Sequence, residues 1–255
     1  MSKKKLRFGL WYDFRNPSQW QRDNTELYHA TFDQIERAEK AGFDDIWLSE
    51  HHFLDDCYSP SMLAIGCAIA ARTTKVRIGT SVLLLPLHDA VRVAEDAATL
   101  DVISGGRLEL GIGVGYKTEE LRAWGVDPKS RGPRMEEGIE ILQRLFAGER
   151  FSFHGQYNHF EDIQLRPMPV QKDLRLWIAG FSKVAVRRAA RVGAGYIAVG
   201  PIGPFTKIYR EELAKQGRSP EGYEVAAGYA WLHVAKDPKK RWSEAVEHIA
   251  YQQNC

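Results

Sequence analysis

The chain has 255 residues, a formal net charge of +2 and 44% hydrophobic residues. These values exclude a strongly basic nucleic-acid-binding protein and a strongly charged disordered chain, and they suit one large α/β domain. No apolar run approaches the roughly 20 residues that a membrane-spanning helix needs, and the three cysteines lack the spacing of a metal site. We therefore expect one cytoplasmic domain over residues 1–255 that binds neither nucleic acid nor membrane.

Short apolar segments rich in branched and aromatic residues alternate along the chain with longer segments of helical period. In residues 26–42, for example, Leu27, Phe32 and Ile35 fall near one helix face. The expected strands lie within 6–13, 44–52, 75–85, 107–115, 174–180, 196–200 and 223–235. The expected helices lie within 26–42, 59–74, 89–106, 134–148, 182–193, 205–217 and 237–253.

This strict alternation predicts a parallel sheet, because parallel neighbours need a crossover connection, usually a helix. An open doubly wound sheet and a (β/α)8 barrel both fit. The uninterrupted series favours the barrel, and no glycine-rich phosphate loop follows the first strand. The predicted fold class is therefore an α/β, TIM-type (β/α)8 barrel that lacks the eighth strand–helix unit in this chain. Residues 151–169 interrupt the series, and their alternating aromatic and polar residues predict a β excursion or hairpin.

The second expected strand ends in three titratable residues, Glu50, His51 and His52. The carboxyl ends of the strands form the working face of such a barrel. Neighbours on a strand point to opposite faces, so the two histidines share one site only if the strand has already ended. A histidine beside a carboxylate at this face suits general acid–base chemistry, and a packed, inert histidine is the alternative. We predict no metal site, because the first strand supplies no histidine.

Two further strand ends carry glycines that would let a flat ligand approach. Gly113 and Gly115 belong to the alternating glycines of the fourth strand, for which inward packing of small residues is the alternative. The fifth strand ends at Gly180, and Phe181 and Ser182 follow. Ser182 can cap the next helix, and a helix N-terminus after a glycine turn binds phosphate well.

Four ordered blocks, residues 32–53, 71–116, 131–171 and 176–197, resemble the bacterial-luciferase-like flavin-dependent oxidoreductases. The resemblance implies a barrel with a flavin across its C-terminal mouth. It also implies a monooxygenase that uses reduced FMN and dioxygen on a small apolar organic substrate. By this resemblance His51 is the acid–base group that faces the flavin, and Glu50 supports its orientation.

The resemblance also assigns residues to the cofactor. Thr80, Ser81 and Val82 of the third strand would contact the flavin ring, with a non-proline cis peptide at Ser81–Val82. Gly113 and Gly115 would form a flat wall on the fourth strand. The phosphate turn would consist of the following residues: Gly180, Phe181 and Ser182.

Some features depart from the family pattern. Val114 stands where luciferase has an arginine that reaches the flavin phosphate, so Lys183 or Arg15 would meet that charge, or the cofactor differs. One alternative is an oxidoreductase dependent on the deazaflavin coenzyme F-420, which passes hydride. Another is a non-catalytic flavin-binding protein or an incomplete fragment. The resemblance further implies a separate NAD(P)H-dependent flavin reductase and a homodimer.

Overall fold

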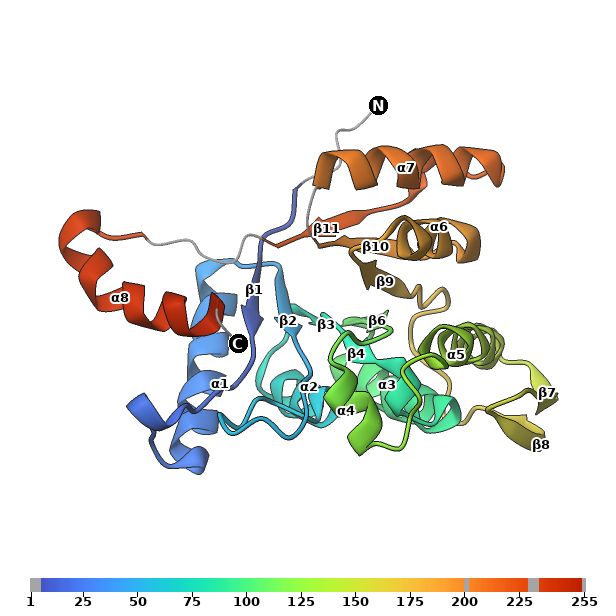
Figure 1. The fold of residues 1–255 in the computed structure, drawn as a ribbon, viewed down its shortest axis with the longest axis horizontal. Coiled ribbons are helices and arrows are strands. Elements are labelled where there is room, and N and C mark those ends of the chain that lie inside the picture. Colours follow the sequence, from blue (N-terminus) through green and yellow to red (C-terminus); the bar gives the residue numbers. More distant parts are fainter. Residues whose placement is uncertain (1–5, 200–201, 229–233, 254–255) are drawn as a thin grey trace.

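A computed structural model describes residues 6–199, 202–228 and 234–253, and a curved parallel sheet forms its centre (Figure 1). The hydrogen-bonded strand orders are β1-β2-β3-β5 and β11-β10-β9-β6-β4. β4 continues β3 and β6 continues β5, so the described part of the chain forms seven parallel strands that follow one another in chain order. Their bounds are β1 Gly9–Tyr12, β2 Asp45–Leu48, β3 Arg77–Thr80, β4 Leu83–Leu84, β5 Leu108–Glu109, β6 Gly111–Gly113, β9 Trp177–Gly180, β10 Gly195–Ala198 and β11 Val225–Ala227.

Helices follow the strands and cover the outer face of the sheet (Figure 1). α1 shows the local signals that set their bounds, because the Asp23 side chain accepts the Glu26 N–H at its start and Gly42 adopts a left-handed conformation at its end. The helices are α1 Asn24–Ala41, α2 Met62–Arg72, α3 Ala90–Ser104, α4 Thr118–Ala123, α5 Arg131–Phe146, α6 Lys183–Val192, α7 Ile202–Lys215 and α8 Pro238–Gln253. The described residues also form three short 3-10 helices, η1 Ser18–Trp20, η2 Leu85–Leu87 and η3 Pro220–Gly222.

The predicted fold class is confirmed, with seven parallel strands of the barrel series. Within the described residues β1 and β11 are the outer strands of the series and do not pair with each other. Residue 200 of the sixth expected strand and residues 229–233 of the seventh lie outside the described residues. The helix α4 was not expected, and it matters for the site.

The predicted excursion is an antiparallel hairpin of β7 Arg150–His154 and β8 His159–Gln164. Glu137 of α5 fastens its turn by accepting the backbone N–H groups of Gln156, Tyr157 and Asn158. The hairpin extends from the side of α5, away from the central sheet (Figure 1).

Apolar residues lie on both sides of the sheet. The larger core packs the outer face of the sheet against the helices, and a smaller inner cluster contains Trp177, Ala179 and Ile197. Trp47 packs against this inner cluster with its ring edge-on to Trp177, the ring centroids 5.7 Å apart. A Cβ atom on Gly79 would lie 2.3 Å from the Trp47 ring, so this glycine is required for the ring to fit.

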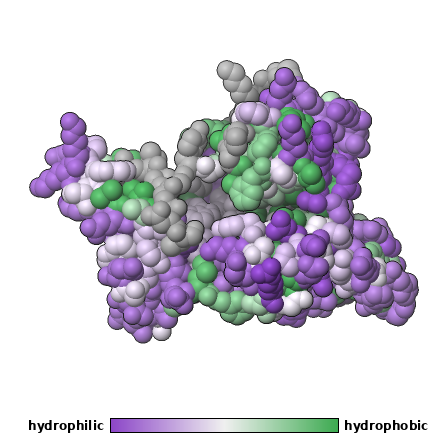
Figure 2. All heavy atoms as spheres, in the orientation of Figure 1, coloured by the Kyte–Doolittle hydropathy of each residue, from purple (hydrophilic) through white to green (hydrophobic). Residues whose placement is uncertain are grey.

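The helix α8 lies beside the segment that follows β1 (Figure 1). The Trp20 and His248 rings are 3.9 Å apart, and the Gln252 side-chain amide donates to Asp13 at 2.7 Å. None of the described helices is both long and apolar enough to cross a membrane. Hydrophilic residues cover most of the face in Figure 2, and hydrophobic ones gather where its centre is hollowed.

Candidate active site

The segment after β2 turns its two histidines in different directions. The His51 ring lies against Tyr58 and Tyr116, with ring centroids 4.8 and 5.5 Å away. The His52 ring instead lies 5.3 Å from the ring of Trp124. This divergence is the one expected of neighbouring residues on an extended segment.

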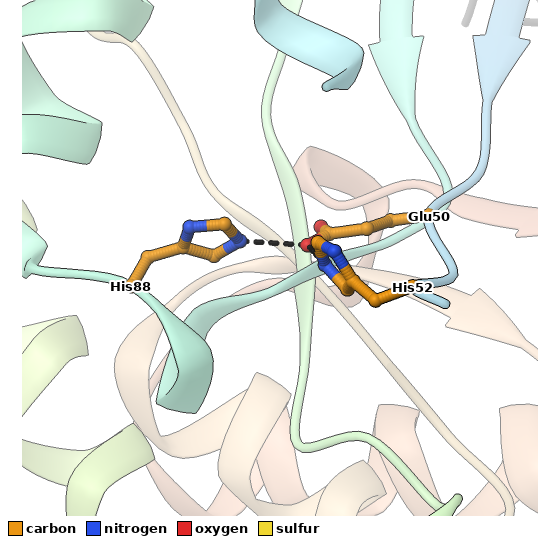
Figure 3. Close-up of side chains that lie close together, drawn as sticks. All are labelled: Glu50, His52 and His88. Carbon is orange, nitrogen blue, oxygen red and sulfur yellow. Dashed lines mark hydrogen bonds and ion pairs between the residues drawn. The ribbon is translucent and has the colours of Figure 1, made fainter. Parts of the chain in front are cut away.

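Glu50 holds a buried hydrogen-bond cluster together (Figure 3). Its Oε1 lies 2.5 Å from His52 Nε2 and 2.7 Å from His88 Nε2, and its Oε2 accepts the Leu84 N–H at 2.9 Å. Burial opposes ionisation of Glu50, but the bonds from the two imidazoles and the Leu84 amide hold its pKa below the usual range. Glu50 is therefore an ionised acceptor that joins the end of β2 to β4 and to the segment before α3.

The same three side chains could be considered as metal ligands, since their ligand atoms lie within 4.8 Å of one another. Nitrogen and oxygen ligands at about 2.0–2.2 Å around a tetrahedral ion stand more than about 3 Å apart. The separations of 2.5 and 2.7 Å are those of hydrogen bonds to one carboxylate oxygen. The arrangement is thus a hydrogen-bonded cluster in its present geometry.

A different carboxylate supports His51. Glu120 of α4 places Oε1 2.7 Å from His51 Nδ1, and the same oxygen accepts the His52 backbone N–H at 2.9 Å. The other ring nitrogen, Nε2, lies 3.3 Å from the Tyr116 hydroxyl. The expectation that Glu50 orients His51 is therefore wrong, because the Glu50 carboxylate is directed to His52 and His88 instead.

Sequence reasoning missed Glu120, although a signal was present. Residues 118–120 read Thr-Glu-Glu, and acidic residues in the first turn are typical of a helix start. The expected helix begins only at residue 134, so the prediction omits the short α4 between strand four and α5.

The third strand carries the expected cis peptide bond between Ser81 and Val82. Both residues are half-buried at the break between β3 and β4. Thr80 is buried, and its hydroxyl both donates to the Gly111 carbonyl and accepts the Gly111 N–H. Thr80 therefore ties strands three and four together, while Ser81 and Val82 are the more accessible of the three predicted contacts.

The glycines of strand four have two different roles. A Cβ on Gly113 would lie 2.6 Å from Val82 Cγ2, so Gly113 allows close approach of the strand that holds the cis peptide. Gly115 has a φ of +73°, a conformation that favours glycine and turns the chain toward α4. Gly113 thus makes room for Val82 at the mouth, and Gly115 lets the backbone turn there.

At the end of β9, Ser182 caps α6 by accepting the Ala185 N–H. A Cβ on Gly180 would lie 2.4 Å from Ala185 Cβ, so this glycine permits the tight strand-to-helix turn. Phe181 is exposed and meets the ring of Tyr116 edge-on at 6.1 Å. The Tyr116–Phe181 contact thus connects the expected phosphate turn to His51 across the mouth.

Arg15 lies behind the same mouth. Its guanidinium stands 4.6 Å from the centre of the Tyr58 ring, and its Nε is 3.3 Å from Asp56 and 3.6 Å from Asp13. Two carboxylates offset the charge of Arg15, but its Nε and Nη1 are buried and make no hydrogen bond within the described residues, so Arg15 stays a candidate to meet a phosphate charge. Lys183 is exposed at the first position of α6 and remains a possible cation for that purpose.

Comparison with known proteins places this arrangement in a family. The model of a family described as "Luciferase-like monooxygenase" matches residues 6–254. The chain belongs to this family. The predicted resemblance to the luciferase-like family is thereby confirmed over nearly the whole chain.

Two curated relatives differ in their cofactors. The chain is 36% identical over 184 residues to an F420-dependent glucose-6-phosphate dehydrogenase of Microbacterium testaceum, covering 69% of this chain and 53% of the relative. It is 30% identical over 177 residues to the oxygenase component of a flavin-dependent trigonelline monooxygenase of Acinetobacter baylyi, covering 68% of this chain and 49% of the relative. The luciferase-like chain thus spans about half the length of each.

A solved structure agrees with the fold. The monooxygenase RslO1 of Streptomyces bottropensis superposes with a TM-score of 0.87 at 25% identity, covering 95% of this chain and 76% of RslO1. The proteins that this chain resembles therefore include both monooxygenases and F420-dependent oxidoreductases.

Proposed function

We propose that this chain is a flavin-dependent monooxygenase that acts on a small apolar organic molecule, with His51 as the acid–base residue. The observation that carries the proposal is the position of the His51 ring. Its Nδ1 is held by Glu120, while its Nε2 faces Tyr116 at the ends of the parallel strands. A base within reach of a mouth lined by aromatic rings suits proton transfer to or from a bound organic molecule.

The residues at the mouth fit a flavin. Gly113 is buried and makes room for Val82, while the half-buried Ser81, Val82 and Gly115 are accessible to a flat ring system at this end of the strands. The N-terminal amides of α6, capped by Ser182, can receive a phosphate group. When bound in its reduced state, the flavin would supply the chemistry with dioxygen.

The protein's own residues would then bind and orient the substrate and exclude water from it. Phe181, Tyr116 and Trp11 are exposed apolar surfaces at or near the mouth, and they suit a small apolar substrate. Burial and the nearby Glu120 charge raise the pKa of Tyr116, so its hydroxyl stays protonated and can donate to His51 Nε2. His51 would hold or move a proton at that nitrogen.

The second candidate function is hydride transfer with coenzyme F-420. The 36% identity to an F420-dependent relative favours it, as does Val114 in place of the phosphate-binding arginine. Both functions use the same mouth and the same His51. The difference lies in the cofactor that the mouth selects.

The deciding experiment is equilibrium binding of reduced FMN and of reduced F-420 to the 255-residue protein, anaerobically and side by side. We expect FMN to bind more tightly, and oxygen then to give an oxygenated product from a panel of aldehydes, terpenes and ketones. Preference for F-420 with hydride transfer would replace the monooxygenase assignment by the second candidate. Binding of neither cofactor would contradict both.

A monooxygenase of this kind needs a source of reduced flavin. We propose a separate NAD(P)H-dependent flavin reductase, in keeping with the relative that is the oxygenase component of its enzyme. Turnover with NADPH should therefore require an added reductase. The expected homodimer and cytoplasmic location stay predictions.

A further inference from the structure

The mouth contains a second buried acid, Glu120, to which neither the sequence motif nor the family comparison gives a role. It belongs to α4, and 69 residues separate it from His51 along the chain. The residue is 4% exposed. A carboxylate so deeply buried is stable only if its oxygens are hydrogen-bonded, so its partners show what it does.

Among the described residues, the two hydrogen-bond partners of the Glu120 side chain meet the same oxygen. The His52 backbone N–H donates to Oε1 at 2.9 Å, and His51 Nδ1 lies 2.7 Å from that oxygen. A backbone N–H can only donate and an ionised carboxylate can only accept, so Oε1 of the ionised Glu120 accepts both hydrogen bonds. His51 must then carry its proton on Nδ1, which leaves Nε2 of the neutral ring without a proton and directed to Tyr116.

The helix α4 holds Glu120 in place through the next residue. Leu121 is buried in a cluster with Leu84, Leu87 and Val126. Just after α4, the Val126 N–H donates to the Leu121 carbonyl at 2.8 Å. The carboxylate is therefore fixed from a packed element, which allows it to select one orientation of the His51 ring.

We propose that Glu120 is the positioning residue for His51, fixing its Nδ1–H tautomer and stabilising the ring when it takes up a proton at Nε2. The proposal rests on the proposed acid–base role of His51 for its effect on turnover. The tautomer of the His51 ring can be measured without any reaction, so this part of the proposal does not depend on the proposed function. An acid that orients a histidine in this way acts on the proton-transfer step and leaves cofactor binding almost unaffected.

Two substitutions separate the charge of Glu120 from its hydrogen bonds. In Glu120→Gln the His52 amide should keep the side-chain oxygen turned toward it, so that oxygen still accepts from His51 Nδ1. The charge alone is lost. In Glu120→Ala both are lost. Glu119→Gln is the matched control, because Glu119 is the exposed neighbour on the same helix.

The first measurement is the ¹⁵N spectrum of the His51 ring in the cofactor-free protein near pH 8, where protonated and bare ring nitrogens give separate signals. We expect Nδ1–H in the wild type, in Glu120→Gln and in Glu119→Gln. In Glu120→Ala we expect a mixture of tautomers. A purely structural role in capping the His52 amide would leave the tautomer of Glu120→Ala unchanged and would overturn the proposal.

The second measurement is turnover against cofactor affinity. We expect kcat to fall about 10-fold in Glu120→Gln and about 10²-fold or more in Glu120→Ala, with cofactor Kd within a few-fold. Wild-type kcat in Glu120→Ala would contradict the proposal. If the wild type itself shows no turnover, the proposed function fails, and the ¹⁵N spectra alone decide whether Glu120 positions the ring.

Discussion

Both ends of the barrel hold buried glutamates, but the glutamates at the two ends have different partners. At the N-terminal ends of the strands, Glu109 accepts from Arg7, Arg77 and the Trp177 indole N–H. At the C-terminal ends, Glu50 and Glu120 are paired with histidines. Arginine stays charged at all ordinary pH values, whereas histidine changes charge near neutrality.

The N-terminal end also holds a cavity of about 160 Å³, which is lined by both signs of charge. Its charged lining residues are Arg77, Glu109, Asp173, Arg175 and Glu224. Fixed ion pairs of this kind suit structural stability, which is the usual role of this end of a barrel. The mouth is suited to proton transfer because its acids meet groups that can gain or lose a proton.

The largest effect expected from this comparison is on activity, at the mouth. His51→Ala removes the proposed acid–base group, so turnover should fall by about 10²–10⁴. Flavin affinity should stay within a few-fold, since the proposed phosphate contacts lie at α6. Steady-state kinetics and equilibrium binding measure the two quantities. His154→Ala, an exposed histidine on the hairpin, is the control, and equal turnover in His51→Ala would make His51 an inert packed residue.

The next effect is on stability, at the opposite end. Glu109→Ala leaves Arg7 and Arg77 without their shared carboxylate and leaves the Trp177 N–H unpaired. Both arginines are about one-third exposed, so the loss should be smaller than for a fully buried pair, about 2–3 kcal/mol. Urea unfolding measures this free energy, and flavin affinity should not change.

The control for Glu109 is Glu149→Ala, which removes an exposed partner of Arg144. Such exposed pairs contribute about 0–1 kcal/mol. Equal losses in the two variants would mean that the N-terminal ion cluster is no more important than a surface pair, and would remove the contrast between the ends.

The smallest effect concerns Asp45, beside the same cluster. Burial, opposed by Arg7 and reinforced by Glu109, raises the pKa of Asp45 to about 6, and its Oδ1 is buried without a hydrogen-bond partner among the described residues. The folded state therefore binds this proton more tightly than the unfolded state. The resulting stability is complete below the ordinary aspartate pKa of 3.8 and is lost as pH rises through about 6.

Asp45→Asn should consequently stabilise the protein at pH 8, by about 1–2 kcal/mol, and should have less effect at pH 5. Urea unfolding of the wild type and the variant at the two pH values tests this. The exposed Asp55→Asn serves as the control. A variant less stable than wild type at pH 8 would show that the Arg7 ion pair outweighs the cost of burying the charge.

Much of the fold could be predicted because its signals are local. Each of the seven parallel strands falls within or one residue from an expected apolar run, and α8 begins one residue inside its expected range. The hairpin was also predictable from alternation in residues 151–169. The helix α4 was missed because its six residues are too few to show a period.

The partners of the site residues were less predictable. Glu50 stands beside His51 in sequence, and the family resemblance predicts that it orients His51. In the structure their side chains diverge, and His88 and Glu120 arrive from segments 38 and 69 residues away. Such long-range partners are set by how the strands curve and how α4 packs, which no local pattern records.

The sequence by itself determined the alternation of strands and helices, and it determined that titratable residues end the second strand. Periodicity acts over a few residues and is readable there. Only the tertiary structure decided which acid meets which histidine, because neighbouring side chains on an extended segment point apart and must find their partners elsewhere. Hence Glu50 binds His52 and His88, while Glu120 binds His51.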